Sequence, residues 1–330
     1  MGRVGPTMVG WEVRDSMSGR ADWSSLQIRT LRPEADIRGL LQLLQEVEAV
    51  DGSDEAADEA AVRATMRWPG HDPASDRWVM VDSERQGQLI AHALAWKGDH
   101  EPSADVSVAV HPHWRRQGIG AALLSLAVDR ARAMGATAVR LYADEQHPAA
   151  ATFLRRQGFE PVAAFTEMRF PGDCALAAPR MAPGYTLRAY REVQDVQLLA
   201  YAMTESYHGQ WGHHAVSAED LEHWLPDWRE DGIFLLFDGT SEVIGLCRAE
   251  LRAPQRGRPL GYVDAPGIVP AHRGEDLYVS LLTSGMHWLR EQGVDAIGLE
   301  SWGDAEPTLE RYSTLGFATV RRAISYRREL

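Results

Sequence analysis

The chain repeats itself at a fixed distance, and this repeat limits what it can fold into. An offset of 158 residues aligns Pro112 with Pro270 and Arg115 with Arg273. Further identities at the same offset join Leu123 to Leu281, Leu124 to Leu282, Gly135 to Gly293, Leu141 to Leu299, Gly158 to Gly316 and Phe159 to Phe317. Self-similarity at a constant period indicates one structural unit used twice. Because 330 residues are about the length of two ordinary domains, the sequence predicts two domains of one fold.

The boundary between the two domains is predicted where the composition changes. The segment 170–184 contains three prolines and two glycines, which is typical of a linker. We therefore expect an N-terminal extension at 1–25, a first domain at 26–171, a linker at 172–184 and a second domain at 185–330. The extension mixes Gly, Arg, Asp and Ser without a continuous apolar run, so we do not interpret it as a signal peptide.

Composition excludes several classes of protein. The formal net charge of -13 opposes binding to nucleic acid, and the lack of a long apolar run argues against a membrane protein. Two cysteines make neither a disulfide framework nor a set of metal ligands, and the twelve histidines lack ligand spacing. We expect a cytoplasmic protein without a metal, and its oligomeric state stays open.

Each half shows the same alternation of strands and helices, which predicts an α/β fold with a mixed sheet. In the first half we expect strands near 26–32, 76–83, 88–97, 103–111, 138–145 and 159–170, and helices near 34–50, 57–68, 118–134 and 147–157. Val106, Val108 and Val110 alternate with smaller or polar residues, as expected of a strand that contacts a core on one face.

One loop between a strand and a helix carries a chemical signal. Residues 115–121 read Arg-Arg-Gln-Gly-Ile-Gly-Ala, with two glycines where the helix begins. The first turn of a helix has unpaired N–H groups and the positive end of the helix dipole, and glycine lets an anion approach closely. The arginines add positive charge. The loop lacks both the ending of an NTPase phosphate loop and the third glycine of a dinucleotide fold, so it predicts a different phosphate ligand.

These residues resemble the acetyl-CoA site of the GNAT acetyltransferase superfamily. The resemblance rests on Val-Ala-Val at 108–110, on Pro112, and on Arg-x-x-Gly-x-Gly-Ala at 115–121. The helix at 147–154 and Gly158-Phe159 resemble the last helix of that family and the Gly-Phe pair that follows it. The tandem arrangement is similar to that of mycothiol synthase and its actinobacterial relatives. The resemblance implies two tandem domains, each with a mixed, mostly antiparallel sheet flanked by helices.

The resemblance also implies a function and a set of site residues. The protein is expected to transfer an acetyl group from acetyl-CoA to an amine of a small molecule, with a longer acyl-CoA left open. The backbone amide of Val108 would polarise the acetyl carbonyl. The expected cofactor-binding residues are Val108, Ala109, Val110, Arg115, Arg116, Gln117, Gly118, Ile119, Gly120, Ala121 and His147. The alternatives are an acyl-CoA-binding regulator without turnover and an acetyltransferase that acts on a protein or peptide.

Two proton-transfer side chains of the family that the sequence resembles are replaced in this chain. The position of the family's leaving-group tyrosine is Leu154, and the position of its frequent glutamate base is Ala104. We take Asp105 as the candidate base. The other nearby candidates are Glu101, His92 and Asp144.

The second half departs from the pattern. Glu275, Asp276 and Tyr278 occupy the positions of Gln117, Gly118 and Gly120. Pro266 replaces Val108 and has no N–H group to donate. The sequence therefore predicts that only the first domain binds CoA, and that Tyr312, the tyrosine at the leaving-group position of the second half, has a packing role.

An acidic group follows the first predicted helix and comprises Asp51, Asp54, Glu55, Asp58 and Glu59. Carboxylates at this position would attract an amine, but we favour the simpler interpretation of a solvated charged loop.

Overall fold

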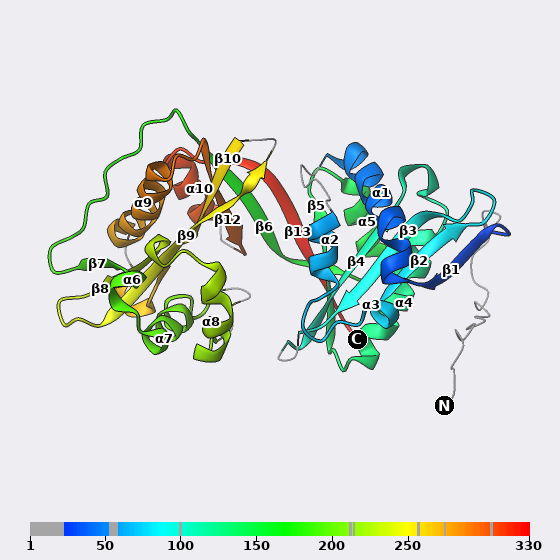
Figure 1. Ribbon diagram of the computed structural model, residues 1–330, viewed down its shortest axis with the longest axis horizontal. Coiled ribbons are helices and arrows are strands. Elements are labelled where there is room, and N and C mark those ends of the chain that lie inside the picture. The colour runs from blue at the N-terminus through cyan, green and yellow to red at the C-terminus, as the bar shows by residue number, and fades with distance from the viewer. Residues whose placement is uncertain are drawn as a thin grey trace. The chain divides into compact units, whose positions relative to one another are not determined.

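The computed structural model describes residues 23–330, apart from 53–58, 99–100, 211–212, 214, 256–257, 274 and 304–305. The chain divides into two compact units (Figure 1). The first extends to Arg140 and includes the terminal pair Glu329–Leu330, and the second comprises Leu141–Arg328. This division differs from the expected domains at 26–171 and 185–330, whose boundaries remain a prediction. Most of the predicted extension and three acidic residues, Asp54, Glu55 and Asp58, lie outside the described residues.

The first unit is a sheet whose strands follow one another in chain order, β1-β2-β3-β4-β5. Its elements are β1 (Leu26–Thr30), α1 (Pro33–Asp51), α2 (Glu59–Thr65), α3 (Pro73–Asp76), β2 (Arg77–Asp82), β3 (Gln88–Trp96), β4 (Ser103–Val110), the 3-10 turn η1 (Pro112–Trp114), α4 (Ile119–Ala133) and the first residues of β5 (Ala138–Asp144). The first four strands pair antiparallel, whereas β4 and β5 pair parallel. The predicted strand at 103–111 and helix at 118–134 are thus present with nearly the expected bounds.

Alternation along β2 gives this sheet two apolar faces. Val79 and Val81 pack with α1 and α2, whereas Met80 between them packs with Ile119 and Leu123 of α4. Successive side chains of a strand point to opposite faces, so α1 and α2 cover one face and α4 covers the other (Figure 1). The loop that precedes α4 is therefore anchored by a helix whose apolar face is buried.

The second unit contains the remaining elements, with the strand order β5-β13-β6-β12-β10-β9-β8-β7. They are α5 (Pro148–Arg156), β6 (Glu160–Pro171), β7 (Thr186–Ala189), α6 (Tyr190–Val193), α7 (Val196–Ser206), α8 (Ala218–Trp224), η2 (Leu225–Asp227), η3 (Glu230–Gly232), β8 (Ile233–Phe237), β9 (Val243–Gln255), β10 (Arg258–Asp264), β11 (Gly267–Ile268), η4 (Pro270–His272), α9 (Glu275–Glu291), β12 (Ala296–Trp302), α10 (Glu306–Thr314) and β13 (Ala318–Glu329).

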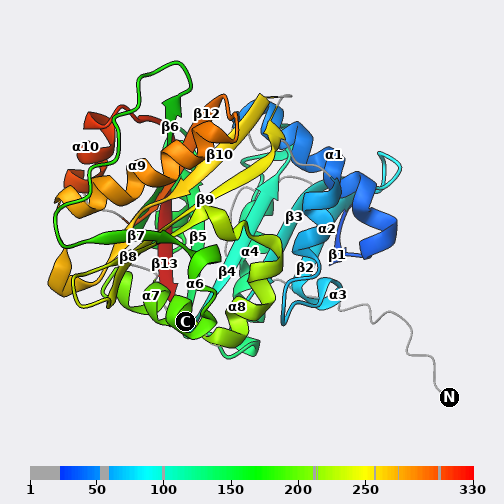
Figure 2. The same cartoon turned by 60° about the vertical axis from the view of Figure 1, so that its left-hand side comes forward.

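This sheet is also covered on both faces. Leu236 packs with the α9 cluster, and its neighbours Leu235 and Phe237 pack with the α7 cluster. Figure 2 shows α9 lying along β9 and β10. The same alternation as in β2 is therefore present at the corresponding place in the second half, as expected of a repeated fold.

The last strand of each half, β6 in the first and β13 in the second, occupies the place in the sheet that is expected for the other. β6 closes the first half of the sequence and pairs antiparallel with β12, while β13 closes the second half and lies next to β5. β6 and β13 also pair with each other, from Arg169 opposite Ala318 to Glu160 opposite Arg327. Equivalent strands present similar edges, which is the physical reason that each can occupy the place of the other. The sequence reasoning did not predict this exchange.

Candidate functional site

The loop from β4 to α4 is built from two residues with left-handed backbone. Arg116 has φ 67° and Gly118, the residue that caps α4, has φ 85°. The N–H groups of Ala121 and Ala122 both bond to the Gly118 carbonyl at 3.1 Å, whereas the amides before them precede any intrahelical acceptor. Successive amides in such a turn form a concave anion-binding surface at the positive end of α4.

Space around the loop suits the approach of a ligand. A Cβ atom built on Gly118 meets only the Trp23 ring within 4 Å, at 3.6 Å. Arg116 is exposed and has no ion-pair partner among the residues that the structure describes. Gln117 donates from Nε2 to the His113 carbonyl at 3.4 Å. Among the described residues, the loop thus combines amides that precede the helical hydrogen bonds with the unpaired guanidinium of Arg116, a donor set that fits a pyrophosphate.

Arg115 differs from its neighbour because its guanidinium is already engaged. Nη1 and Nη2 donate to the two carboxylate oxygens of Asp51, each at 2.8 Å, and Nε donates to the Val110 carbonyl at 3.0 Å. The sequence reasoning placed Asp51 only in the acidic group after the first helix. In the structure Asp51 is the last residue of α1, where the helix dipole disfavours a negative charge, and no local pattern in the sequence pairs it with Arg115.

In the part of the chain that the structure describes, no strand pairs with β4 along the edge beside the loop. β5 pairs with β4 only from Ser103 to Asp105, while β3 continues along β4 to Val110. The amide of His111 bonds to the Ile90 carbonyl of β3, and the bonding direction alternates along an antiparallel strand. The amide of Val108 therefore points away from β3, toward the unpaired edge.

Asp105, the candidate base, is held in an ion pair. Both of its oxygens accept from Arg140 of the adjacent strand, at 2.6 and 2.9 Å. A carboxylate offers about four lone-pair positions, so the ion pair leaves acceptor capacity on Asp105.

Two further positions from the sequence analysis, the predicted cofactor-binding residue His147 and Leu154 at the family's tyrosine position, lie in the second unit. His147 is the N-cap residue of α5, and its backbone amide bonds to the Asp144 carbonyl at 3.0 Å. Leu154 is buried on the same helix. The role predicted for His147 in cofactor binding stays a prediction.

The equivalent region of the second half is filled by aromatic side chains. The Tyr207 hydroxyl donates to the Ala265 carbonyl at 2.7 Å, and a Cβ atom on Gly267 would lie 2.9 Å from the Tyr207 ring. Tyr278, at the position of Gly120, shares a hydrogen bond with the buried Tyr312. Burial raises the pKa of Tyr207 well above its usual value, so its hydroxyl stays neutral.

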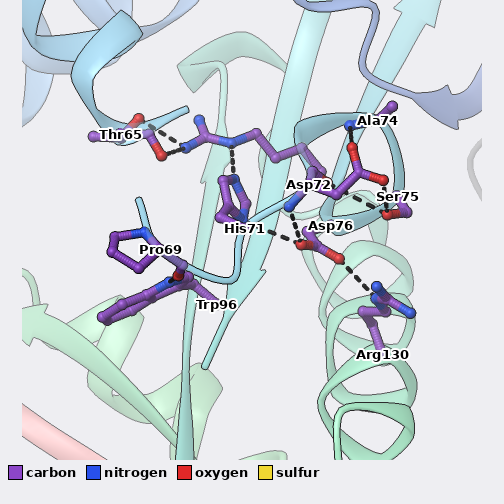
Figure 3. Close-up of polar contacts among 10 residues, drawn as sticks. Thr65, Pro69, His71, Asp72, Ala74, Ser75, Asp76, Trp96 and Arg130 are labelled. Carbon is purple, nitrogen blue, oxygen red and sulfur yellow. Dashed lines mark hydrogen bonds and ion pairs between the residues drawn. The ribbon is translucent and has the colours of Figure 1, made fainter. Parts of the chain in front are cut away.

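A buried polar network in the first unit joins the end of α2, the residues before β2 and the second half of α4 (Figure 3). Arg77 donates from Nε to His71 Nε2 at 2.9 Å and from Nη2 to the Thr65 hydroxyl at 2.7 Å. His71 Nδ1 lies 3.3 Å from Asp76, which also accepts from Arg130 at 2.7 Å. Since Nε2 of His71 accepts, its proton is on Nδ1 and faces the carboxylate. These contacts join the segment after α2 to both β2 and α4.

His92, one of the alternative bases, is buried on β3 near this network. Its Nε2 has no hydrogen-bond partner in the described part of the chain. Burial, followed by the charges of Arg77 and His71, lowers the pKa of His92 to about 3. A buried imidazole with so low a pKa is a weak proton acceptor at neutral pH, which disfavours His92 as the base.

Within the described residues, we find no helix with the length and apolarity needed to cross a membrane. The same residues contain no group of three or more His, Cys, Asp or Glu side chains suited to hold a metal ion.

Comparison with known proteins identifies chains that are similar to this one. The model of the acetyltransferase (GNAT) family matches residues 38–159. A mycothiol acetyltransferase from a Nocardioides species is 32% identical over 310 residues, covering 87% of this chain and 98% of the relative. Among solved structures, a GCN5-related N-acetyltransferase from Sphaerobacter thermophilus gives a TM-score of 0.75 at 21% identity, covering 92% of this chain and 96% of that one. A tandem GNAT protein from the clavulanic acid biosynthesis pathway gives 0.67 at 19% identity, covering 92% and 98%.

Proposed function

The chain belongs to the GNAT acetyltransferase family, and on that premise we propose that its N-terminal half transfers an acetyl group from acetyl-CoA to an amine of a small molecule. The observation that carries this proposal is the glycine loop at the start of α4, with free amides beside the unpaired edge of β4. Acetyl-CoA would supply the acetyl thioester. The amides of 118–120 and the Arg116 guanidinium would bind its pyrophosphate.

In this proposal, the backbone amide of Val108 donates a hydrogen bond to the oxyanion that forms during the reaction. An amine that attacks a thioester places negative charge on the carbonyl oxygen, and a fixed N–H directed at that oxygen stabilises the transition state more than the ground state. The unpaired edge from Val108 to Val110 supports the addition of the extended pantetheine there. Orientation of the two reactants supplies much of the remaining acceleration.

The proposed site has fewer side chains for proton transfer than the family pattern contains. Asp105 remains our candidate for the base, through a lone pair that Arg140 does not use. With Leu154 at the tyrosine position, the departing thiolate would take its proton from solvent, which a thiol with a pKa near 8.5 tolerates. We therefore expect turnover without a tyrosine acid.

We further propose one cofactor for each chain. In the second half, Tyr207 and Tyr278 fill the space beside the strand and helix start that correspond to Val108 and Gly120. Pro266 has no amide to donate at the Val108 position. These features support a second half that binds no CoA.

The acceptor is proposed as a small-molecule amine because the relative from Nocardioides carries the name mycothiol acetyltransferase. The test is amine-dependent release of free thiol from acetyl-CoA, across amino sugars, amino acids, polyamines and peptides. We expect release with at least one small amine and none from a Gly118→Asp, Gly120→Tyr variant. Release with peptides alone would favour a peptide acceptor, and no release with any amine would refute the proposal.

A further inference from the structure

Arg115 has no free donor pair for a phosphate in this structure. Three of its nitrogen atoms donate to Asp51 and to the Val110 carbonyl, at 2.8 to 3.0 Å. Two N–H groups remain, one on Nη1 and one on Nη2, and they point in different directions. A two-bond contact between the end of this guanidinium and a phosphate would therefore require breaking the bidentate ion pair, the strongest arrangement that arginine and a carboxylate form. The guanidinium of Arg116, the next residue, can make such a contact without breaking an ion pair.

The partner of Arg115 lies at an electrostatically unfavourable place. Asp51 is the last residue of α1, where the helix dipole is negative, and the last turn of α1 contains no basic residue. Glu46, one turn earlier, lies 3.2 Å from Nε2 of His111. Both carboxylates thus lie close to side-chain nitrogen atoms of the connection from β4 to α4. The end of α1 is hydrogen-bonded to this connection through Asp51 and Arg115, whereas Glu46 only lies near the His111 ring.

The repeat provides an independent observation. Arg273, the equivalent of Arg115, donates from Nε to the Ile268 carbonyl at 2.9 Å, and Ile268 is the equivalent of Val110. Its Nη2 donates to the His208 carbonyl at 2.6 Å. The second half lacks the loop glycines, yet the arginine keeps the same bond to its strand. This contact therefore does not depend on a phosphate site.

We propose that Arg115 is a positioning residue of the acyl-CoA site: the ion pair with Asp51 and the bond to Val110 hold the glycine loop against the end of α1, and the loop amides with Arg116 bind the phosphates. This inference rests on the proposed function of the first half. It changes the role expected from the sequence, in which the Arg115 side chain was itself a ligand.

The two roles predict opposite effects of Asp51→Asn. If Arg115 were a phosphate ligand, removing the carboxylate would free its guanidinium and remove a negative charge near the anion, so acetyl-CoA would bind more tightly. If Arg115 positions the loop, the variant weakens binding. An exposed or half-buried ion pair contributes about 1 kcal/mol, so we expect the dissociation constant for acetyl-CoA to rise about fivefold.

The experiment is calorimetric titration of the full-length protein with acetyl-CoA. The matched control is Asp129→Asn, which makes the same charge change in an exposed ion pair with Arg132 on α4. Asp51→Glu keeps the charge and should restore binding to within about twofold of wild type. The urea midpoint of each variant is measured to verify folding.

Weaker binding by Asp51→Asn alone, with rescue by Asp51→Glu, supports the positioning role. Tighter or unchanged binding by a folded Asp51→Asn variant overturns it. If instead the wild-type protein binds no acetyl-CoA, the proposed function fails, which is a different result from any of these. An Asp51→Glu variant that is as weak as Asp51→Asn also overturns the ion pair as the cause.

Discussion

His92→Leu should make the protein less sensitive to acid. The pKa of His92 is lowered to about 3 in the folded chain, against 6.5 as its ordinary value. Between these values the unfolded chain binds the proton and the folded chain does not, so stability present at pH 7 is lost as pH falls below about 6.5. At pH 5 this loss is about 2 kcal/mol, because one pKa unit corresponds to about 1.4 kcal/mol.

The measurement is urea unfolding of wild type and His92→Leu at pH 7 and pH 5. At pH 7 the two should agree to within about 1 kcal/mol, since leucine removes an imidazole nitrogen that has no partner. At pH 5 the variant should be more stable by about 2 kcal/mol. His223→Leu, at an exposed position, is the control and should follow wild type. Equal losses of stability on acidification in wild type and His92→Leu would refute the assignment.

Two further substitutions test other parts of the structure. Asp76→Asn replaces one carboxylate oxygen by an NH2 group, which then faces a donor, either the Arg130 guanidinium or the Asp72 amide. This change should lower the free energy of unfolding by about 2 kcal/mol. An unchanged urea midpoint would contradict the network. Tyr207→Phe removes the bond to the Ala265 carbonyl and should cost about 1 kcal/mol of stability while the dissociation constant for acetyl-CoA stays the same. A changed affinity in that variant would argue against a cofactor site confined to the first half.

Local patterns predicted the parts of the fold that local physics determines. Alternation at Val106, Val108 and Val110 places β4, and the glycines after Arg116 place the start of α4. Each signal depends on residues within one turn or one strand. For this reason the glycine loop and the strand beside it were predictable before the structure.

Contacts between distant segments were not predictable in the same way. Asp51 and Arg115 are 64 residues apart, and no local pattern indicates which carboxylate an arginine meets. The exchange of β6 and β13 has a related cause: the two strands are equivalent in the repeat, so the sequence does not distinguish the sheet position of one from that of the other. The tyrosines of the second half, by contrast, were visible as departures from the repeat, and the structure adds that Tyr278 and Tyr312 bond to each other.

The central claim is one acyl-CoA site per chain, formed by the glycine loop of the first half. Calorimetric titration with acetyl-CoA measures it directly through the number of sites. We predict one site in the wild-type protein and none in the Gly118→Asp, Gly120→Tyr variant, which gives the first loop the residues of the second. Two sites in the wild type, or full binding by the variant, would contradict the claim.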